Sequence, residues 1–354
     1  MRKSEKPPQK RLERHFQPDN MERDEDSLYD HYTLQAAEGQ KPLRVDKFLA
    51  NLLPFTTRSK IKNASQTGSI SVNGKEVKVS YKVRAGDEVR LMLPFPPPPE
   101  LTAEEMDLDI RYEDPYLMVV HKPPGMVVHP SFGHWTGTLI HGLLWHFEKL
   151  PGDRLRPGLV HRIDKDTSGL LVIAKEEHAM AHLSKQFFDH TSDRTYHAIA
   201  WGDLPEDKGT IIGRVGRSKS DRKKYHNYPM DSDKGKPAIT HYEVLERFGI
   251  MTLVECTLET GRTHQIRVHM KYLGHPLFND VFYGGDRIIA GGKTKKFQQF
   301  IRNGFQLLPR QALHAKTLAF DHPHSGERMT FDSEWPVDFQ LLMEKLRKWA
   351  TFQE

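Results

Sequence analysis

The sequence contains almost no cysteine and no long apolar run. Its 354 residues include a single cysteine, Cys256, which excludes an internal disulfide and a metal cluster built from cysteines. No apolar stretch approaches the roughly 18 residues that a membrane-spanning helix needs. The first ten residues, MRKSEKPPQK, lack the apolar centre of a secretory signal. These absences predict a soluble protein of a reducing compartment, and we expect it to be cytoplasmic, without membrane contact.

The charge of the chain is unevenly distributed. Hydrophobic residues make up 37% of the sequence and charged residues 28%, which suits about two globular domains. Residues 1–40 carry seven basic and nine acidic side chains, and residues 41–93 carry eleven basic and four acidic ones. The remaining residues, 94–354, carry 34 of each sign. The excess positive charge therefore lies in one short segment, as expected of a module that binds a polyanion.

Residues 1–40 contain few apolar residues and show no sustained period, so we expect a disordered tail. The basic segment over residues 41–93 has a clearer pattern. Apolar residues recur on one helical face from Val45 until Pro54, and residues 59–66 suit a second, basic helix. Asn73-Gly74 then predicts a tight hairpin, followed by a further strand up to residue 93. These signals predict a small α+β module, in which we expect three cations to contact the polyanion: Arg58, Lys60 and Lys62.

A proline run separates this module from the rest of the chain. Pro96–Pro99 suits neither a helix nor a central strand, so residues 94–100 are predicted to form a stiff linker before a domain over residues 101–350. Beyond the linker, short β-rich runs alternate with glycine and proline turns, which predicts an α+β fold with a largely antiparallel sheet. The expected strands cover residues 117–121, 170–174, 196–200, 253–258 and 315–320, and the expected helices cover residues 176–188 and 263–273.

The densest group of reactive side chains lies between residues 158 and 174. There the sequence GLVHRIDKDTSGLLVIA places His161, Arg162, Asp164 and Asp166 in a polar loop between two apolar runs. Folded proteins often present reactive groups on such loops, held by a rigid scaffold. The loop could also be a structural turn in which Asp164 or Asp166 caps backbone amides.

This loop resembles the signature of the RluA/RluD-type pseudouridine synthases, in which His-Arg-Leu-Asp precedes Thr-Ser-Gly-Leu-Leu; here Ile163 replaces the leucine. Other segments resemble further parts of that family in the same order. They are residues 110–130 (IRYEDPYLMVVHKPPGMVVHP), 194–198 (RTYHA), 261–269 (GRTHQIRVH) and the closing strands over residues 311–336. Residues 41–93 resemble the small RNA-binding domain shared with a small-subunit ribosomal protein and with tyrosyl-tRNA synthetases.

The resemblance implies an enzyme that isomerises uridines of structured RNA, with large-subunit rRNA as the expected target. It assigns Asp164 as the nucleophile, Arg267 as its basic partner and Tyr196 as the ring that packs on the flipped base. Breaking a base–ribose C–N bond and forming a C–C bond suits a carboxylate, which an arginine would keep ionised in a dry pocket. Arg162 would stack in the gap that the base leaves. We expect a monomer without metal, cofactor or protein partner.

Several of these residues have a plainer interpretation. Tyr196 could be a core aromatic, and Arg162 could form a surface ion pair with Asp164. A basic run over residues 214–224, RVGRSKSDRKK, is either a solvated loop or a phosphate contact. In the second case we expect RNA to be bound by Arg217, Arg222, Lys223 and Lys224.

Some of these residues also match the patterns of proteins with other functions. The sequence DKDTS from Asp164 matches a motif of Mg²⁺-dependent phosphatases, but His161 and Arg162 stand where that motif has a buried strand. His264 and His269 are five residues apart on an expected helix, about 140° around its axis, so they do not share a metal-binding face. Two alternatives stay closer to the resemblance: a non-catalytic RNA-binding ribosome-assembly factor, and a synthase that acts on tRNA.

Overall fold

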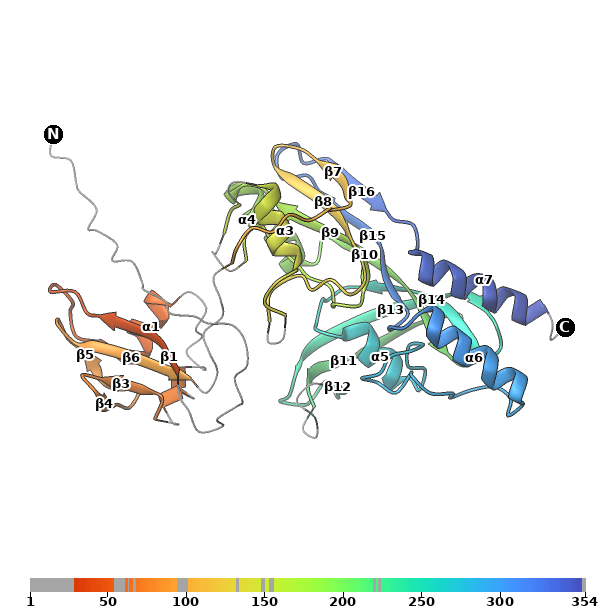
Figure 1. Cartoon of the computed structure of the whole chain (residues 1–354), viewed down its shortest axis with the longest axis horizontal. Helices are drawn as coiled ribbons and strands as arrows, with labels where there is room; N and C mark the ends of the chain where they lie inside the picture. Colours follow the sequence, from red (N-terminus) through yellow and green to blue (C-terminus); the bar gives the residue numbers. More distant parts are fainter. Residues whose placement is uncertain are drawn as a thin grey trace. The chain divides into compact units, whose positions relative to one another are not determined.

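The computed structural model describes residues 29–53, 61–62, 64–65, 68–93, 101–131, 134–147, 150–152, 156–218, 221 and 224–351. The chain divides into two compact units, Met1–Glu100 and Leu101–Glu354 (Figure 1). None of the described helices combines the length and the apolar character needed to cross a bilayer.

The first unit contains a small sheet and helix α1, which packs in the core of the unit. Its main sheet has the strand order β1-β6-β3-β4, and β2 pairs with β5. Helix α1 buries Val45, Phe48 and Leu49 in the core of the unit, as the apolar spacing predicts. The bounds are β1 Tyr29–Gln35, β2 Leu43–Arg44, α1 Val45–Leu52, β3 Ile70–Val72, β4 Lys75–Glu76, β5 Lys82–Val83 and β6 Glu88–Leu93.

The hairpin in this unit is confirmed. Asn73 and Gly74 both have a positive φ, +51° and +76°, and the flanking Val72 and Lys75 pair across the turn. A two-residue turn with positive φ at both positions matches the twist of the strands that it joins. Of the expected second helix, residues 61–62 and 64–65 are helical, while Arg58 and Lys60 lie outside the described residues.

The prediction of a disordered tail over residues 1–40 is wrong at its C-terminal end. Residues Tyr29–Gln35 form strand β1, which pairs with β6 from Tyr29↔Leu93 to Gln35↔Glu88. Tyr32 and Leu34 pack against the core of the unit. An edge strand of this kind is stabilised by a partner far along the chain, so local composition does not reveal it. Residues 1–28 and the linker 94–100 lie outside the described residues.

The second unit is built on one large mixed sheet, which confirms the predicted α+β fold with mostly antiparallel pairing. The strand order is β12-β11-β13-β14-β10-β15-β9-β8-β7, and β16 pairs with β15. Of these pairs, β9–β15 is parallel. The strands are β7 Ile110–Glu113, β8 Leu117–Lys122, β9 Ser168–Ala174, β10 Asp193–Trp201, β11 Lys208–Arg217, β12 Tyr225–Tyr228, β13 Lys236–Arg247, β14 Met251–Leu258, β15 Leu313–Asp321 and β16 Arg328–Asp332.

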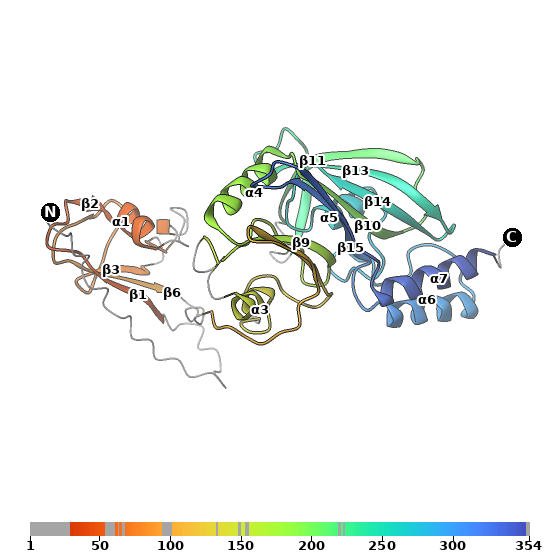
Figure 2. The ribbon, with the colours of Figure 1, turned by 90° about the horizontal axis from the view of Figure 1, so that it is seen from above.

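Five helices are described in this unit. They are α3 Leu139–His146, α4 Glu177–Asp189, α5 Gln265–Tyr272, α6 Lys295–Leu307 and α7 Val337–Thr351. The two helices and five strands expected from the sequence are all present. Helices α3, α6 and α7 and several strands, among them β11, β12 and β13, were not anticipated. Figures 1 and 2 both show α6 and α7 side by side near the C-terminal end of the chain.

The side chains of strand β10 alternate between the two faces of the sheet, and each face has its own apolar cluster. Ile199 and Trp201 point toward the apolar cluster that packs under α6 and α7. Tyr196, Ala198 and Ala200 point toward the opposite cluster. This alternation follows from the two-residue period of a strand. It places Tyr196 on the face where the sheet also meets the polar loop before β9.

The polar loop reaches the middle of the sheet because β15 changes partners along its length. Its residues Thr317–Asp321 pair with β16, whereas His314 and Ala315 pair with β9. Gly169 lies at this junction with φ +117°, and a Cβ atom there would be 2.2 Å from the Ala315 carbonyl oxygen. Only glycine fits this approach. Residues 161–167 immediately precede the junction and are thereby presented at the centre of the sheet.

Candidate active site

The loop that carries Asp164 is anchored through its backbone. The Thr167 amide donates to the Asp164 carbonyl oxygen (3.1 Å), which closes a turn. Lys122 Nζ donates to the Lys165 carbonyl oxygen (2.8 Å), and Arg310 Nη1 donates to that of Asp166 (2.9 Å). In the described part of the chain, no backbone amide donates to the carboxylate of Asp164 or Asp166. The interpretation of these aspartates as amide caps is therefore wrong, and the Asp164 side chain is left available for other contacts.

Lys122 and Arg310 are positioning residues for this loop. The Lys122 side chain is buried and donates to three carbonyl oxygens, those of Pro123, Met126 and Lys165, each at 2.8 Å. Three acceptors match the three hydrogens of an ammonium group, although burial lowers the pKa of Lys122 to about 7. Arg310 binds Asp338 of α7 through Nε and Nη2, at 2.7 and 2.9 Å. The loop is thus tied to strand β8 and to α7.

Arg267 lies between two carboxylates. Its Nη1 donates to Asp164 Oδ2 at 3.0 Å, while Nε and Nη2 donate to the two oxygens of Asp280 at 2.7 and 2.8 Å. The side chains are 4% exposed for Arg267, 0% for Asp280 and 18% for Asp164. The planar guanidinium suits this arrangement because its donors form a rigid fork. Arg267 therefore holds Asp164 against a buried anchor and leaves Asp164 the more accessible carboxylate.

Asp280 was not anticipated from the sequence, yet it completes the anchor. Its Oδ1 also accepts from the backbone amides of Phe282 (3.1 Å) and Tyr283 (3.3 Å). Burial alone would lower the pKa of Arg267, but the hydrogen bonds and charge of Asp280, together with Asp164, raise it above its ordinary value. Arg267 consequently remains a cation at any working pH. Arg267 lies in the first turn of α5, within the helix that the sequence predicts.

His264 is a second neighbour of Asp164 that was not proposed. Its Nε2 lies 3.8 Å from Asp164 Oδ2, and its Nδ1 lies 2.8 Å from the Tyr283 hydroxyl. That hydroxyl already accepts from the Tyr225 amide (3.1 Å), which leaves its own hydrogen for His264 Nδ1. Burial lowers the pKa of His264, although Asp164 raises it. This arrangement favours a neutral ring whose Nε2–H faces Asp164.

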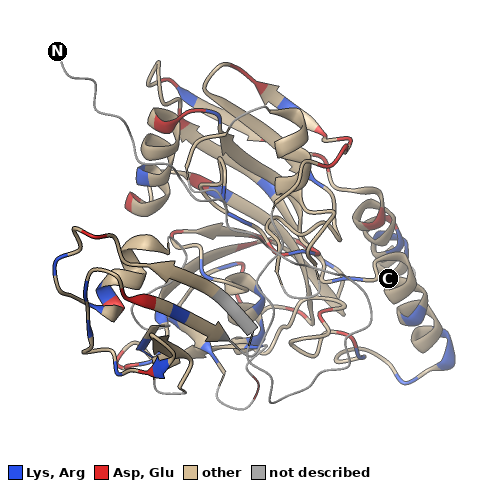
Figure 3. Cartoon of the chain, turned by 60° about the vertical axis from the view of Figure 1, so that its left-hand side comes forward, with Lys and Arg blue, Asp and Glu red and all other residues tan. Residues whose placement is uncertain are grey.

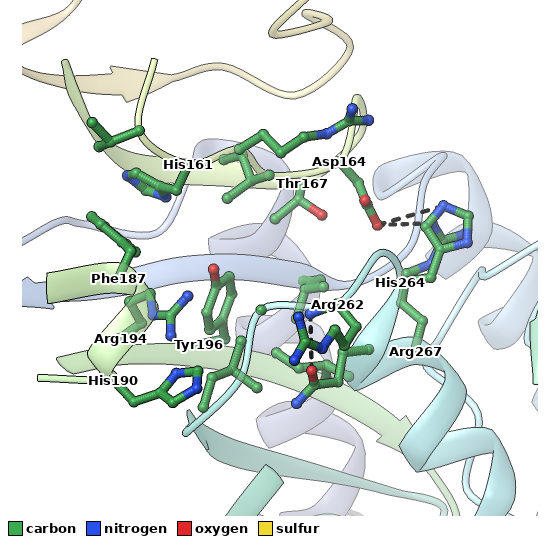
Figure 4. Close-up of a pocket in the computed structure, with 18 of the residues that line it drawn as sticks. His161, Asp164, Thr167, Phe187, His190, Arg194, Tyr196, Arg262, His264 and Arg267 are labelled. Carbon is green, nitrogen blue, oxygen red and sulfur yellow. Dashed lines mark hydrogen bonds and ion pairs between the residues drawn. The ribbon is translucent and has the colours of Figure 1, made fainter. Parts of the chain in front are cut away.

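Asp164, Tyr196 and Arg267 line one pocket of about 390 Å³, a volume within the range of small-ligand sites. Figure 4 shows the Tyr196 ring beneath the loop, with its hydroxyl directed toward it, and the contacts from Asp164 to His264 and Arg267. Burial raises the pKa of the Tyr196 hydroxyl, and Asp164 adds to the shift while Arg194 opposes it. Tyr196 is therefore a neutral aromatic in the pocket wall. It is both buried in the core and part of the site.

The far end of the pocket contains a buried cation that was also not anticipated. Arg194 is 6% exposed, and its guanidinium lies 5.2 Å from the Phe187 ring. Among the described residues, its Nε and Nη2 have no hydrogen-bond partner. On the other side of Phe187, His161 stacks on the ring at 4.4 Å, and its Nε2 accepts from the Val172 amide. Burial lowers the pKa of His161 to about 3, so this ring is neutral.

The expected RNA contacts occupy different places. Arg162 is exposed at the pocket, and within the described part of the chain it forms no ion pair with Asp164 or another carboxylate. Arg217 lies over the Tyr225 ring (4.8 Å), and Lys224 Nζ lies 3.8 Å from Asp221. Lys62 is exposed on the first unit. Arg222 and Lys223, like Arg58 and Lys60, lie outside the described residues.

The described residues contain no group of three or more histidine, cysteine, aspartate or glutamate side chains that could hold a metal. His264 has a left-handed backbone conformation at the start of α5 and faces the pocket, whereas His269 is buried and its Nδ1 lies 2.9 Å from Thr240 Oγ1.

The pocket can supply a carboxylate from Asp164, a fixed cation from Arg267 and an aromatic wall from Tyr196. These groups suit attack on an electron-poor carbon beside a planar base.

The sequence matches two protein families. Residues 116–272 match the family described as RNA pseudouridylate synthase, and residues 43–89 match the S4 domain. The first match spans the loop with Asp164, strand β10 and helix α5. The second spans α1 and strands β2 to β5 of the first unit, including its hairpin.

Named relatives agree with these matches over nearly the whole chain. The chain is 48% identical to the uncharacterized RNA pseudouridine synthase YlyB of Bacillus subtilis, covering 89% of this chain and 98% of that protein. It is 41% identical to the ribosomal large subunit pseudouridine synthase D of Zymomonas mobilis, covering 86% and 93%. Among solved structures, human RNA pseudouridylate synthase domain containing 4 is 24% identical, covers 67% of this chain and 92% of that one, and has a TM-score of 0.50, a likeness of fold.

Proposed function

This chain belongs to the RNA pseudouridine synthases, with an S4 domain before the synthase domain, and from that premise we propose that it isomerises specific uridines of large-subunit rRNA. The contact that carries the proposal is the one between Asp164 and Arg267, 3.0 Å apart in the pocket that Tyr196 also lines. The relatives named ribosomal large subunit pseudouridine synthase D support the choice of rRNA. The rival choice is tRNA.

In the proposed reaction, Asp164 is the nucleophile. Its carboxylate attacks C1′ of the ribose, and the C1′–N1 bond breaks with its electron pair leaving on the uracil. The uracil rotates, its C5 bonds to C1′, and the Asp164 carboxylate is released. The C5 proton is then lost to solvent and N1 takes up a proton, which yields pseudouridine, an isomer of uridine, without any net redox change. Arg267 holds the carboxylate in place and Tyr196 packs on the base, so each residue of the site has a distinct task.

The proposed reaction also needs the target base to leave the RNA stack. Enzymes that act on a base inside structured RNA or DNA extrude it into a pocket. Arg162 is exposed beside the pocket and, in the described part of the chain, has no carboxylate partner, so its guanidinium is available to stack in the vacated position. Arg217 and Lys224, on the β11–β12 hairpin, are proposed to contact phosphates nearby.

The direct test uses RNA labelled with tritium at uridine C5. Release of tritium from deproteinised large-subunit rRNA, and not from tRNA, is expected for the wild-type protein. Release from tRNA alone would replace the proposed substrate while leaving the reaction intact. No release from either RNA would favour the alternative of a non-catalytic RNA-binding factor.

The S4 domain is expected to act as an electrostatic anchor. Removing residues 1–93 deletes a segment with a net charge of +7 over residues 41–93. If about half of its basic side chains reach phosphates, the slope of log affinity against log salt becomes shallower by roughly 4. Tritium release from a saturating minimal RNA should persist, because the proposed catalytic residues lie beyond the linker. The measurement is RNA affinity across a salt series.

A charge-neutral deletion provides the control for this experiment. Residues 1–28 carry seven basic and seven acidic side chains, so their removal leaves the net charge unchanged and should leave the slope unchanged. Equal slopes for the protein without residues 1–93 and for the full chain would show that the S4 domain does not anchor the RNA.

His264 is expected to act as a positioning residue for Asp164. In His264→Gln the amide nitrogen occupies nearly the place of Nε2, whereas in His264→Asn the shorter side chain cannot reach Asp164. His264 has φ +58°, a conformation that asparagine tolerates better than glutamine. We therefore expect His264→Asn to be the more stable variant but to lose about tenfold in kcat, and His264→Gln to keep most of the activity. If the more stable of the two variants were also the more active one, His264 would be a purely structural residue.

The proposed chemistry requires no metal. Activity is expected to survive EDTA when the RNA is folded in monovalent salt, because Asp164, Arg267 and Tyr196 supply the groups that the reaction needs. The measurement is the rate of tritium release with and without EDTA, with RNA folding checked separately. A loss that only Mg²⁺ restores, with the RNA still folded, would bring back the phosphatase-like interpretation of Asp164 and Asp166.

A further inference from the structure

A basic groove lies between α6 and α7, outside the residues matched by either family. Its cavity of about 660 Å³ is lined by residues of both helices, including Lys296, Lys345 and Lys348. Phe300 and Trp349 form the aromatic part of the lining, with their rings stacked at 4.3 Å and 26°. The groove therefore combines cations with an aromatic wall.

The positive charge around this groove is concentrated and largely unpaired. Residues 293–307 and 337–351 contain seven lysines and arginines but two acidic residues, whereas residues 94–354 as a whole are balanced. Of the seven, Arg347 pairs with Glu246 (2.8 Å). The other six form no ion pair with any described carboxylate: Lys293, Lys295, Lys296, Arg302, Lys345 and Lys348. Figure 3 shows basic segments along the helices next to the C-terminus.

The two acidic side chains of residues 293–307 and 337–351 leave these segments with a net charge of +5. Asp338 is bound by Arg310 at 2.7 Å, so its charge is already paired. Glu344 remains as a carboxylate without an ion-pair partner in the described part of the chain. Three lysines that line one groove repel one another, and a bound polyanion would relieve that repulsion. The groove thus has the charge and the aromatic lining that nucleic-acid surfaces use.

The groove is tied to the same body as the active site. Asn279, next to the buried anchor Asp280, donates through Nδ2 to the carbonyl oxygens of Phe305 (3.2 Å) in α6 and Leu308 (2.7 Å) just after it. Arg310 joins Asp338 of α7 to the Asp166 carbonyl oxygen of the loop that carries Asp164. An RNA segment held between α6 and α7 would therefore be held in fixed register with the pocket.

We propose that the groove between α6 and α7 binds the phosphate backbone of the substrate RNA at a distance from the target uridine. Lys296, Lys345 and Lys348 neutralise phosphates, and the aromatic lining accommodates a base or a ribose. This proposal rests on the proposed function, because it takes the bound RNA to be the substrate of the enzyme. It adds a second binding surface within the synthase domain, separate from the S4 domain and from the β11–β12 hairpin.

The test compares two double variants of the full-length protein, with deproteinised large-subunit rRNA as the probe. Lys345→Gln/Lys348→Gln removes two cations of the groove. Lys208→Gln/Arg347→Gln removes two cations that already pair with Glu243 and Glu246. The groove variant is expected to bind about tenfold more weakly near physiological salt, with a salt slope shallower by about 1.4–1.8. The control variant should match the wild-type slope.

Lysine acetylation of the wild-type protein, with and without this RNA, provides a readout that needs no mutation. RNA should protect Lys296, Lys345 and Lys348 but not Lys208. Unchanged affinity of the groove variant, an equal loss in the control, or acetylation of the three lysines unaffected by RNA would each overturn the proposal. A failure of this proposal can be distinguished from a failure of the proposed function, because binding is measured without turnover and Asp164→Asn serves as the inactive reference.

Discussion

Replacing Asp164 with asparagine is expected to lower uridine isomerisation by more than about a thousandfold, because the amide has no charge with which to attack the ribose. The substitution keeps the shape of the side chain, so the pocket should stay intact. RNA affinity should change by less than about tenfold, since the affinity of proteins for nucleic acids depends largely on contacts with phosphates. The measurement is tritium release from C5-labelled rRNA, alongside RNA affinity.

Asp166→Asn is the matched control for this variant. Asp166 lies in the same loop, but its carboxylate has no ion pair or hydrogen bond in the described part of the chain, and only its backbone carbonyl is used, by Arg310. We expect Asp166→Asn to retain most of the activity. If Asp164→Asn released tritium at more than a few per cent of the wild-type rate, Asp164 would not be the nucleophile.

Replacing Arg267 with leucine is expected to lower the free energy of unfolding by about 3–5 kcal/mol, the usual result of removing one member of a buried ion pair. The substitution leaves Asp280 fully buried without its bidentate partner and leaves Asp164 without its fixed cation. Activity should fall along with stability, because the Asp164 carboxylate loses the group that orients it. Urea unfolding and tritium release measure the two effects.

Two further variants separate charge from geometry. Arg267→Lys keeps the cation but cannot bind both oxygens of Asp280 while reaching Asp164, so it should restore only part of the stability and of the activity. Arg262→Leu removes a half-buried neighbour that donates to the Pro237 carbonyl oxygen and forms no ion pair with a described carboxylate. It should cost far less than Arg267→Leu. An equally stable, fully active Arg267→Leu protein would show that another cation supports Asp164.

The residues that lie in sequence motifs could be predicted, and those that only complete the site in space could not. Asp164, Tyr196 and Arg267 stand in segments that resemble a known family, and the structure brings all three to one pocket. Asp280 lies in an unremarkable stretch and becomes important only because the fold places it beside Arg267. Arg194 is two residues before Tyr196, and the period of the strand could have placed it on the same face.

The same contrast holds for the fold. Strands with continuous apolar runs, such as β8 and β9, were predicted because burial on both faces leaves a strong local signal. Strand β1 was missed because its stabilising contacts come from β6, more than 50 residues away. Helix α7 carries Phe339, Leu342 and Leu346 at helical spacing, and all three are buried. A search for the helical period would therefore have found it.

The most direct test of the proposed function is a map of pseudouridines in cellular RNA. RNA from cells that lack the gene would be compared with RNA from the same cells carrying the wild-type protein or Asp164→Asn. One or a few pseudouridines of large-subunit rRNA should disappear without the gene, return with the wild-type protein and stay absent with Asp164→Asn. Unchanged pseudouridines in rRNA and tRNA, or their return with Asp164→Asn, would contradict the proposal.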